Sequence, residues 1–145
     1  MDEKRPERER PEIAMRGVSA CRGVRGATSV DEPTDGAGLA TAVGEMLETI
    51  LEQNQASTED VAAVIFTVPD DLRGTNPAAA ARGQGFASVP LLVVREHGGD
   101  DRVARCLRVL LLLNTTLGQS QLRHAYLRGA RLLRPDLLAS GADHS

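Results

Sequence analysis

The chain has few aromatic and sulfur-containing side chains for its length of 145 residues. It contains one Tyr, two Phe, no Trp and two Cys. A core built from this composition has to be aliphatic. Two cysteines are too few for a disulfide framework, and Cys21 and Cys106 lack the CxxC or Cys/His spacing that would hold zinc. We therefore predict a protein of a reducing compartment, the cytoplasm, with no metal site.

Long apolar runs are also missing. The longest strongly apolar run, Val109 to Leu113, is far shorter than the roughly 20 residues that a membrane helix needs, and no N-terminal stretch resembles a signal peptide. The net charge is −3, and few aromatic residues are present for stacking on bases. The sequence thus predicts a soluble, unexported protein that binds neither membrane nor nucleic acid.

The length suits one folded domain, and hydrophobic residues make up an ordinary 41% of the chain. Residues 1–15 carry four basic and five acidic side chains and almost nothing apolar, so we expect a disordered extension there. The folded domain is expected over residues 16–138. Residues 139–145 are expected to form a flexible tail.

Hydrophobic periodicity predicts one long helix and several strands. Apolar residues recur every three or four positions over 35–54, which is typical of an amphipathic helix with one buried stripe. Asn76 and Pro77 predict the N-cap and first position of a short helix over 78–82 that ends near Gly83 and Gly85. Helical turns are expected at 57–60 and 119–123, and strands at 18–29, 61–68, 89–95 and 124–133. Over 103–114, periodicity alone does not separate a buried strand from a helix.

This order of elements predicts an α/β or α+β domain in which one helix covers most of one face of a sheet. The second face then needs another cover, and self-association would supply it.

Two arginine-bearing segments carry the main chemical signal. Arg22 and Arg25 lie in the stretch RGVRGAT, and Arg108 leads into the apolar run that begins at Val109. An unpaired guanidinium at the edge of an apolar run is costly, so an anionic partner is expected. We interpret these segments as the binding site of a small carboxylic acid. The sequence offers no nucleophile with a paired base and no phosphate-binding loop.

The order and spacing of the motifs resemble those of the AroH-type, monofunctional chorismate mutases over about residues 22–137. The resemblance implies a mixed five-stranded sheet on one long helix, with residues 107–114 as a strand, and a homotrimeric pseudo-α/β-barrel with active sites between subunits. The motifs that carry it are Arg22–Thr28, Pro69-Asp70, Pro77-Ala78 with Arg82, Val89-Pro90, Glu96, Cys106–Val109, Arg123–Leu127 and Leu133–Leu137.

The resemblance implies a catalytic activity without a cofactor, the rearrangement of chorismate to prephenate in phenylalanine and tyrosine synthesis. By this resemblance Arg108 contacts the ether oxygen that is released, and Arg25 and Tyr126 hold the side-chain carboxylate. Glu96 receives the ring hydroxyl. The resemblance also implies further substrate-binding positions, namely Asn76, Ala78, Ala79, Arg82, Val93, Leu133 and Arg134. Of these, Arg82 and the stretch around Ala78 would come from the neighbouring subunit.

Three positions depart from patterns found in the family. Asn76 stands where a Phe is frequent, Ala79 where some members have Lys, and Val93 where some have Cys. We expect these changes to raise the Michaelis constant before they lower turnover. Cys106 shares the strand face of Arg108, which predicts either a thiol near the pocket or a small buried filler.

The three histidines, His97, His124 and His144, are expected to be structural or exposed. Two alternative functions stay open. One is a non-catalytic trimer that binds a small carboxylic acid, for which the same arginines would serve. The other is a deaminase of reactive imines with a similar trimeric architecture, against which the pattern of Tyr126 and Arg134 favours the mutase.

Overall fold

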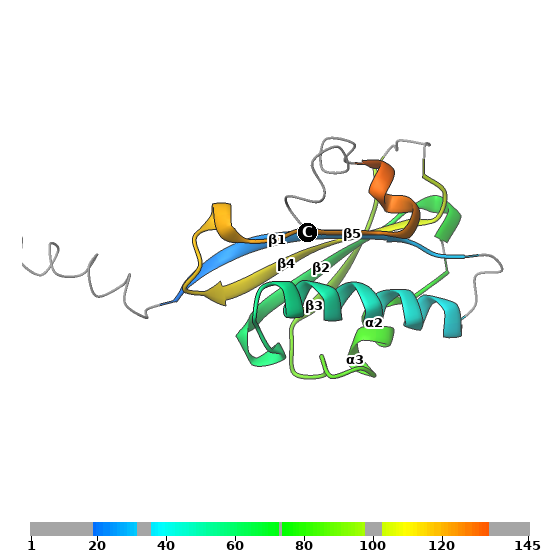
Figure 1. Cartoon of the computed structure of the whole chain (residues 1–145). Coiled ribbons are helices and arrows are strands. Elements are labelled where there is room, and N and C mark those ends of the chain that lie inside the picture. Colours follow the sequence, from blue (N-terminus) through cyan, green and yellow to red (C-terminus); the bar gives the residue numbers. More distant parts are fainter. Residues whose placement is uncertain (1–18, 32–35, 73, 98–102, 134–145) are drawn as a thin grey trace, which may run out of the picture.

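The computed structural model describes residues 19–31, 36–72, 74–97 and 103–133, which contain one five-stranded mixed sheet. The strands lie in the order β3-β2-β4-β1-β5 (Figure 1). The central strand β4 is antiparallel to β1 and β2, while β3 is parallel to β2 and β5 is parallel to β1. The strand bounds are β1 Ala20–Ser29, β2 Val61–Val68, β3 Leu91–Arg95, β4 Cys106–Thr115 and β5 Ala125–Leu127.

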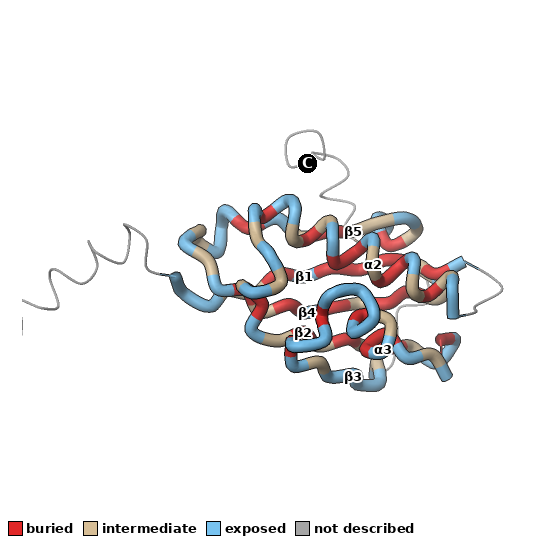
Figure 2. The backbone as a smooth tube through the Cα atoms, turned by 90° about the horizontal axis from the view of Figure 1, so that it is seen from below, coloured by how far each residue is buried: buried red, intermediate tan, exposed pale blue. Residues whose placement is uncertain are grey.

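The long helix α2, Gly36–Gln53, packs against one face of this sheet. Its buried stripe includes Met46 and Ile50, which meet the central strands. At Gly26 the helix comes so close that a Cβ would lie 2.9 Å from Ile50 Cδ1 and from Val109 Cγ1. Figure 2 shows buried residues along β1, β4 and β2, whereas β3 at the edge has none.

The short helix α3, Pro77–Arg82, lies on the same side of the sheet, beside α2. The Asn76 side chain accepts a hydrogen bond from the backbone N–H of Ala79 at 3.0 Å, so the predicted N-cap is confirmed. The Gln84 amide donates to the Ala40 carbonyl at 2.9 Å and thereby ties the end of α3 to α2.

Most predicted elements are confirmed, including the order of strands and helices, and residues 103–114 resolve largely as strand β4. Strand β3 begins two residues later than expected, at Leu91, because Pro90 has no backbone N–H for the ladder. Three short 3₁₀ helices join these elements: η1 Thr58–Asp60, η2 Asp70–Leu72 and η3 Gln119–Gln121.

The prediction of a last strand over 124–133 was wrong for most of its length. The strand β5 covers only Ala125–Leu127, and the chain then forms a 3₁₀ helix, η4, over Arg128–Leu133. Arg128 has a positive φ of 53°, which no β-strand accommodates. The residues that alternated in the sequence instead bury Ala130 on the face of the sheet opposite α2.

That second face, which we call the open face, is covered by η4 at one end and carries exposed apolar side chains toward β3. Leu92 is 56% exposed and Leu110 is 39% exposed, and Ile65 lies between them in the register. None of the helices in the described ranges is long and apolar enough to cross a membrane. The predicted terminal segments 1–15 and 139–145 lie outside the described residues.

Candidate active site

Strand register brings several predicted site residues into one row across the open face. Tyr126 of β5 pairs with Ala27 of β1, Ala27 pairs with Arg108 of β4, and Arg108 pairs with Thr67 of β2. Residues that face one another across adjacent strands point to the same side of the sheet. Tyr126 and Arg108 therefore flank Ala27 on this face, and Ala27 itself is buried against Cys106 and Ala130.

Glu96 joins this row from the end of β3. Its Oε2 lies 2.9 Å from Arg108 Nε, and its Oε1 accepts a hydrogen bond of 2.6 Å from the Thr67 hydroxyl. The approach to Arg108 has the geometry of an ion pair rather than of a hydrogen bond. Arg108 makes no other ion pair or hydrogen bond through its side chain with a described residue. Its guanidinium is thus held by one carboxylate while its remaining N–H groups stay available.

Arg25 lies on the same face, where it pairs with Leu110. This pair lies two residues along the strands from the pair of Ala27 and Arg108. Its backbone N–H donates to His124 Nδ1 at 3.0 Å, whereas its exposed guanidinium is not ion-paired with any residue of the described ranges. The two arginines and the single carboxylate of Glu96 leave a net positive charge at this end of the open face. This positive charge favours the binding of an anionic ligand.

Cys106 lies two residues before Arg108 and faces the same side, as expected, but it is buried under η4 against Ala27 and Ala130. Burial raises the pKa of its thiol to about 11, and the positive charge of Arg108 opposes this shift in part. The thiol therefore stays protonated near neutral pH. Cys106 acts as a buried filler, the second of the two expectations.

The other predicted binding residues lie away from this row. Asn76, Ala78, Ala79 and Arg82 belong to α3 or its cap, on the α2 side of the sheet, and Val93 shares the face of Phe66, which is also the α2 side. Leu133, by contrast, packs in the cluster around Ala27 and Cys106 on the open face. Arg134 lies outside the described residues. Within one chain, the predicted site residues therefore form two separate sets.

Sequence reasoning missed Thr67 and the contact of His124. Thr67 is the one hydroxyl side chain in the apolar strand β2, and this lone polar residue was the available signal for its role in holding Glu96. No pattern in the sequence indicated the contact of His124 with Arg25, because this contact depends on the parallel pairing of β5 with β1.

Two further features bear on possible ligands. Among the described residues, no group of three or more His, Cys, Asp or Glu side chains could hold a metal ion. A surface cavity of about 750 Å³ lies between α2 and the segment that follows α3, lined by Glu45, Glu48 and Glu52 together with Leu51 and Phe86. Its acidic rim would repel a carboxylate, so the arginine row is the better candidate site.

Comparisons with known proteins identify a matching family and similar sequences and structures. The family described as chorismate mutase type I matches residues 21–137. The chain is 49% identical over 117 residues to the chorismate mutase AroH of Thermus thermophilus, which covers 80% of this chain and 95% of that protein. It is 35% identical over 117 residues to the chorismate mutase AroH of Bacillus subtilis (strain 168), which covers 80% of this chain and 91% of that protein. A solved structure of a chorismate mutase from Clostridium thermocellum superimposes with a TM-score of 0.71 at 32% identity, and covers 76% of this chain and 97% of that one.

Proposed function

Because the chain belongs to the chorismate mutase type I family, we propose that it converts chorismate to prephenate at the row of Arg25, Glu96, Arg108 and Tyr126. The reaction breaks one C–O bond and forms one C–C bond within the same molecule. It moves no proton to or from the protein and needs no cofactor. The protein has to hold the substrate in a compact conformer and to stabilise the charge that develops on the ether oxygen.

The observation that carries the proposal is the position of Arg108. Its guanidinium is held by Glu96, which Thr67 fixes in turn, and its remaining N–H groups are free of described residues. A cation that is already oriented costs no reorganisation when negative charge builds up on the leaving oxygen. Arg108 thus stabilises the transition state more than the ground state.

The other residues of the row bind the ends of the substrate. Arg25 and the Tyr126 hydroxyl hold the side-chain carboxylate, and Glu96 accepts the ring hydroxyl while it offsets the charge of Arg108. Chorismate carries two negative charges, whereas the row alone has a net charge of one positive. The site therefore needs at least one more cation.

The second set of predicted residues supplies this cation from another subunit. Arg82, with Asn76, Ala78, Ala79 and Val93, lies on the α2 side of the sheet and cannot reach the row of its own chain. We place the active sites at the interfaces of a homotrimer, in which the exposed apolar residues of the open face are buried. Leu133 and Arg134 would border the pocket from the C-terminal side. Two free cysteines fit an enzyme of the reducing cytoplasm.

The test of the mechanism replaces Arg108 with citrulline, which keeps the shape of the side chain and removes its charge. Chorismate consumption is followed by the loss of its absorbance, and the product is identified by acid conversion to phenylpyruvate. We expect kcat to fall on the order of 10² or more with a modest change in substrate binding. The matched control is R131Q, which removes an exposed arginine of η4.

Two results would contradict parts of this proposal. Retained turnover in the citrulline variant would exclude the charge of Arg108 as the source of catalysis. Native protein that binds chorismate and leaves it unchanged would instead be a carboxylate-binding protein.

A further inference from the structure

Two arginines with left-handed backbone conformations flank the strands that carry the site. Arg105, with φ of 48°, comes directly before β4, and Arg128, with φ of 53°, comes directly after β5. A residue with a Cβ adopts this conformation rarely, and it persists where the surrounding structure holds it in place. Arg105 is held by backbone and side-chain contacts to Val30 and Asp71.

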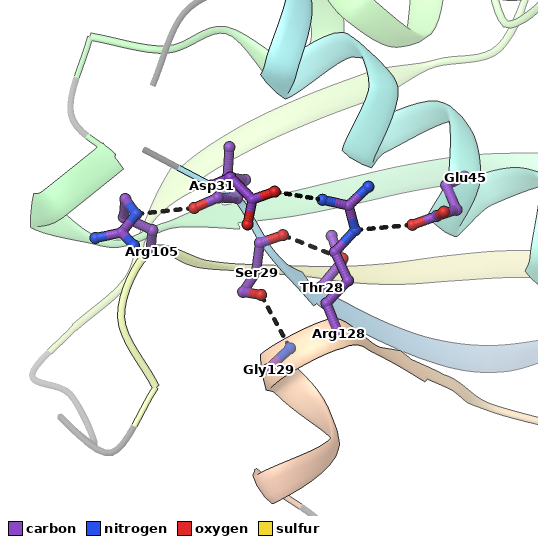
Figure 3. Close-up of polar contacts among 8 residues, drawn as sticks. Thr28, Ser29, Asp31, Glu45, Arg105, Arg128 and Gly129 are labelled. Carbon is purple, nitrogen blue, oxygen red and sulfur yellow. Dashed lines mark hydrogen bonds and ion pairs between the residues drawn. The ribbon is translucent and has the colours of Figure 1, made fainter. Parts of the chain in front are cut away.

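The Arg128 side chain forms a clamp between three segments of the chain. Its Nε donates to Glu45 Oε1 at 3.0 Å, and its Nη1 lies 3.3 Å from Asp31 Oδ2 (Figure 3). Glu45 belongs to α2, and Asp31 lies just beyond the end of β1. The side chain of Arg128 therefore reaches the α2 side of the sheet, while the backbone that follows it turns onto the open face as η4.

This clamp acts on a strand that has few other constraints. The strand β5 is three residues long and lies at the edge of the sheet, paired with β1. Its start is anchored by Asn54, whose side chain accepts from the Arg123 N–H at 2.8 Å and donates to the Arg123 carbonyl at 3.1 Å. Its end is anchored by Arg128 and by the hydrogen bond of 3.0 Å from the Gly129 N–H to Ser29 Oγ. Tyr126 lies between these two anchors.

We propose that Arg128 is a positioning residue that fixes Tyr126 for substrate binding through its bridge to Glu45 and Asp31. This inference rests on the proposed role of Tyr126 at the active site. The bridge is partly exposed, with side-chain exposures of 31% for Arg128 and 47% for Glu45. Such an ion pair contributes little to the free energy of unfolding. Its effect should therefore appear in substrate binding rather than in stability.

The test compares full-length R128Q, E45Q and R128K with the matched control R131Q, which removes an arginine of η4 that has no ion pair within the described ranges. We expect R128Q and E45Q to raise the KM for chorismate roughly five- to tenfold, with kcat within about a factor of two of the native value. The thermal midpoint of R128Q and E45Q should change little. The KM of R128K should lie between those of R128Q and the native protein, and R131Q should behave as the native protein. E45Q leaves the backbone at Arg128 untouched, so it keeps the test valid if R128Q folds poorly.

A double-mutant cycle with Y126F then shows whether Arg128 acts through Tyr126. We expect R128Q to have little further effect on KM in the Y126F background, because the hydroxyl that it positions is already gone. If R128Q raises KM by its full factor in that background, or if E45Q leaves KM unchanged, the inference is overturned and the proposed active site stands. If Y126F alone has the native KM, both the inference and the proposed role of Tyr126 are overturned.

Discussion

Cys106 and Arg108 lie on the same face of β4, two residues apart, yet their surroundings give them opposite properties. Cys106 is covered by η4 and is 5% exposed, whereas Arg108 lies beyond this cover and faces the carboxylate of Glu96. Burial disfavours the thiolate more strongly than the nearby guanidinium favours it, so the pKa of Cys106 rises from 9.0 to about 11. The thiol is therefore inert beside a polar site.

This shift predicts the pH dependence of Cys106 reactivity. In a C21S variant, Cys106 should react slowly with a thiol reagent at pH 8, and the rate should rise about tenfold per pH unit past pH 9 and level off only near the folded pKa of about 11. Below pH 9 the shift has no effect on stability. Between pH 9 and 11 the unfolded state loses this proton first, so stability should fall over that window.

The measurement is the rate of thiol modification from pH 7 to 11, with the same variant unfolded in guanidinium chloride as the control. In the unfolded chain the rate should level off near pH 9. A rate that levels off near pH 9 in the folded protein as well would show that the thiol is not buried.

At the scale of elements, the contact between α2 and β1 decides how closely the helix approaches the sheet. Gly26 faces α2 from the middle of β1, and a Cβ there would lie 2.9 Å from Ile50 Cδ1 and 3.4 Å from Met46 Cγ. Gly23, three residues earlier, faces the open side, where a Cβ would meet only Leu110 Cδ1 at 3.6 Å. The same residue type therefore has different roles at two positions of one strand.

We predict that G26A lowers the free energy of unfolding by about 1–3 kcal/mol, because the added methyl group overpacks the joint of helix and sheet. The matched control, G23A, should leave stability unchanged or raise it slightly, since its Cβ makes an ordinary contact and restricts the unfolded chain. Urea denaturation followed by circular dichroism measures both. Equal effects of the two substitutions would show that α2 can shift to accommodate the methyl group.

At the scale of the whole molecule, one chain holds the predicted site residues in two separate sets and leaves apolar side chains exposed on the open face. The arginine row lies at one end of the open face, while Arg82 and its neighbours lie on the α2 side of the sheet. Leu92 and Val94 of β3 are 56% and 38% exposed on the open face. Trimer assembly as proposed would resolve both features at once, because it buries this face and brings Arg82 of one subunit to the row of another.

We therefore predict that L92E disrupts the trimer and abolishes most of the activity. Leu92 is already more than half exposed in a single chain, so the added carboxylate should affect the fold of the subunit much less than the assembly. The control T41E places the same charge on the exposed outer side of α2 and should remain trimeric. Sedimentation velocity measures the assembly and chorismate consumption the activity. A trimeric, active L92E would show that the open face is not the interface.

Much of the fold could be predicted from the sequence because its signals are local. The apolar stripe of α2, the N-cap at Asn76 and the strand character of Val61–Val68 depend on residues close together in the chain, and all three are confirmed. The last strand was predicted too long, because Arg128–Leu133 alternates like a strand while the left-handed turn at Arg128 is held by distant Glu45 and Asp31.

The sequence by itself determined the aliphatic core, the order of helix and strands, and the guanidinium groups that call for an anionic ligand. Only the tertiary structure decided which groups meet. The antiparallel register of β4 with β1 and β2 sets Arg108 between Ala27 and Thr67, and the end of β3 brings Glu96 to it. The physical reason is that composition and periodicity act over a few residues, whereas register and side-chain pairing depend on segments up to about a hundred residues apart, which only the packed sheet brings together.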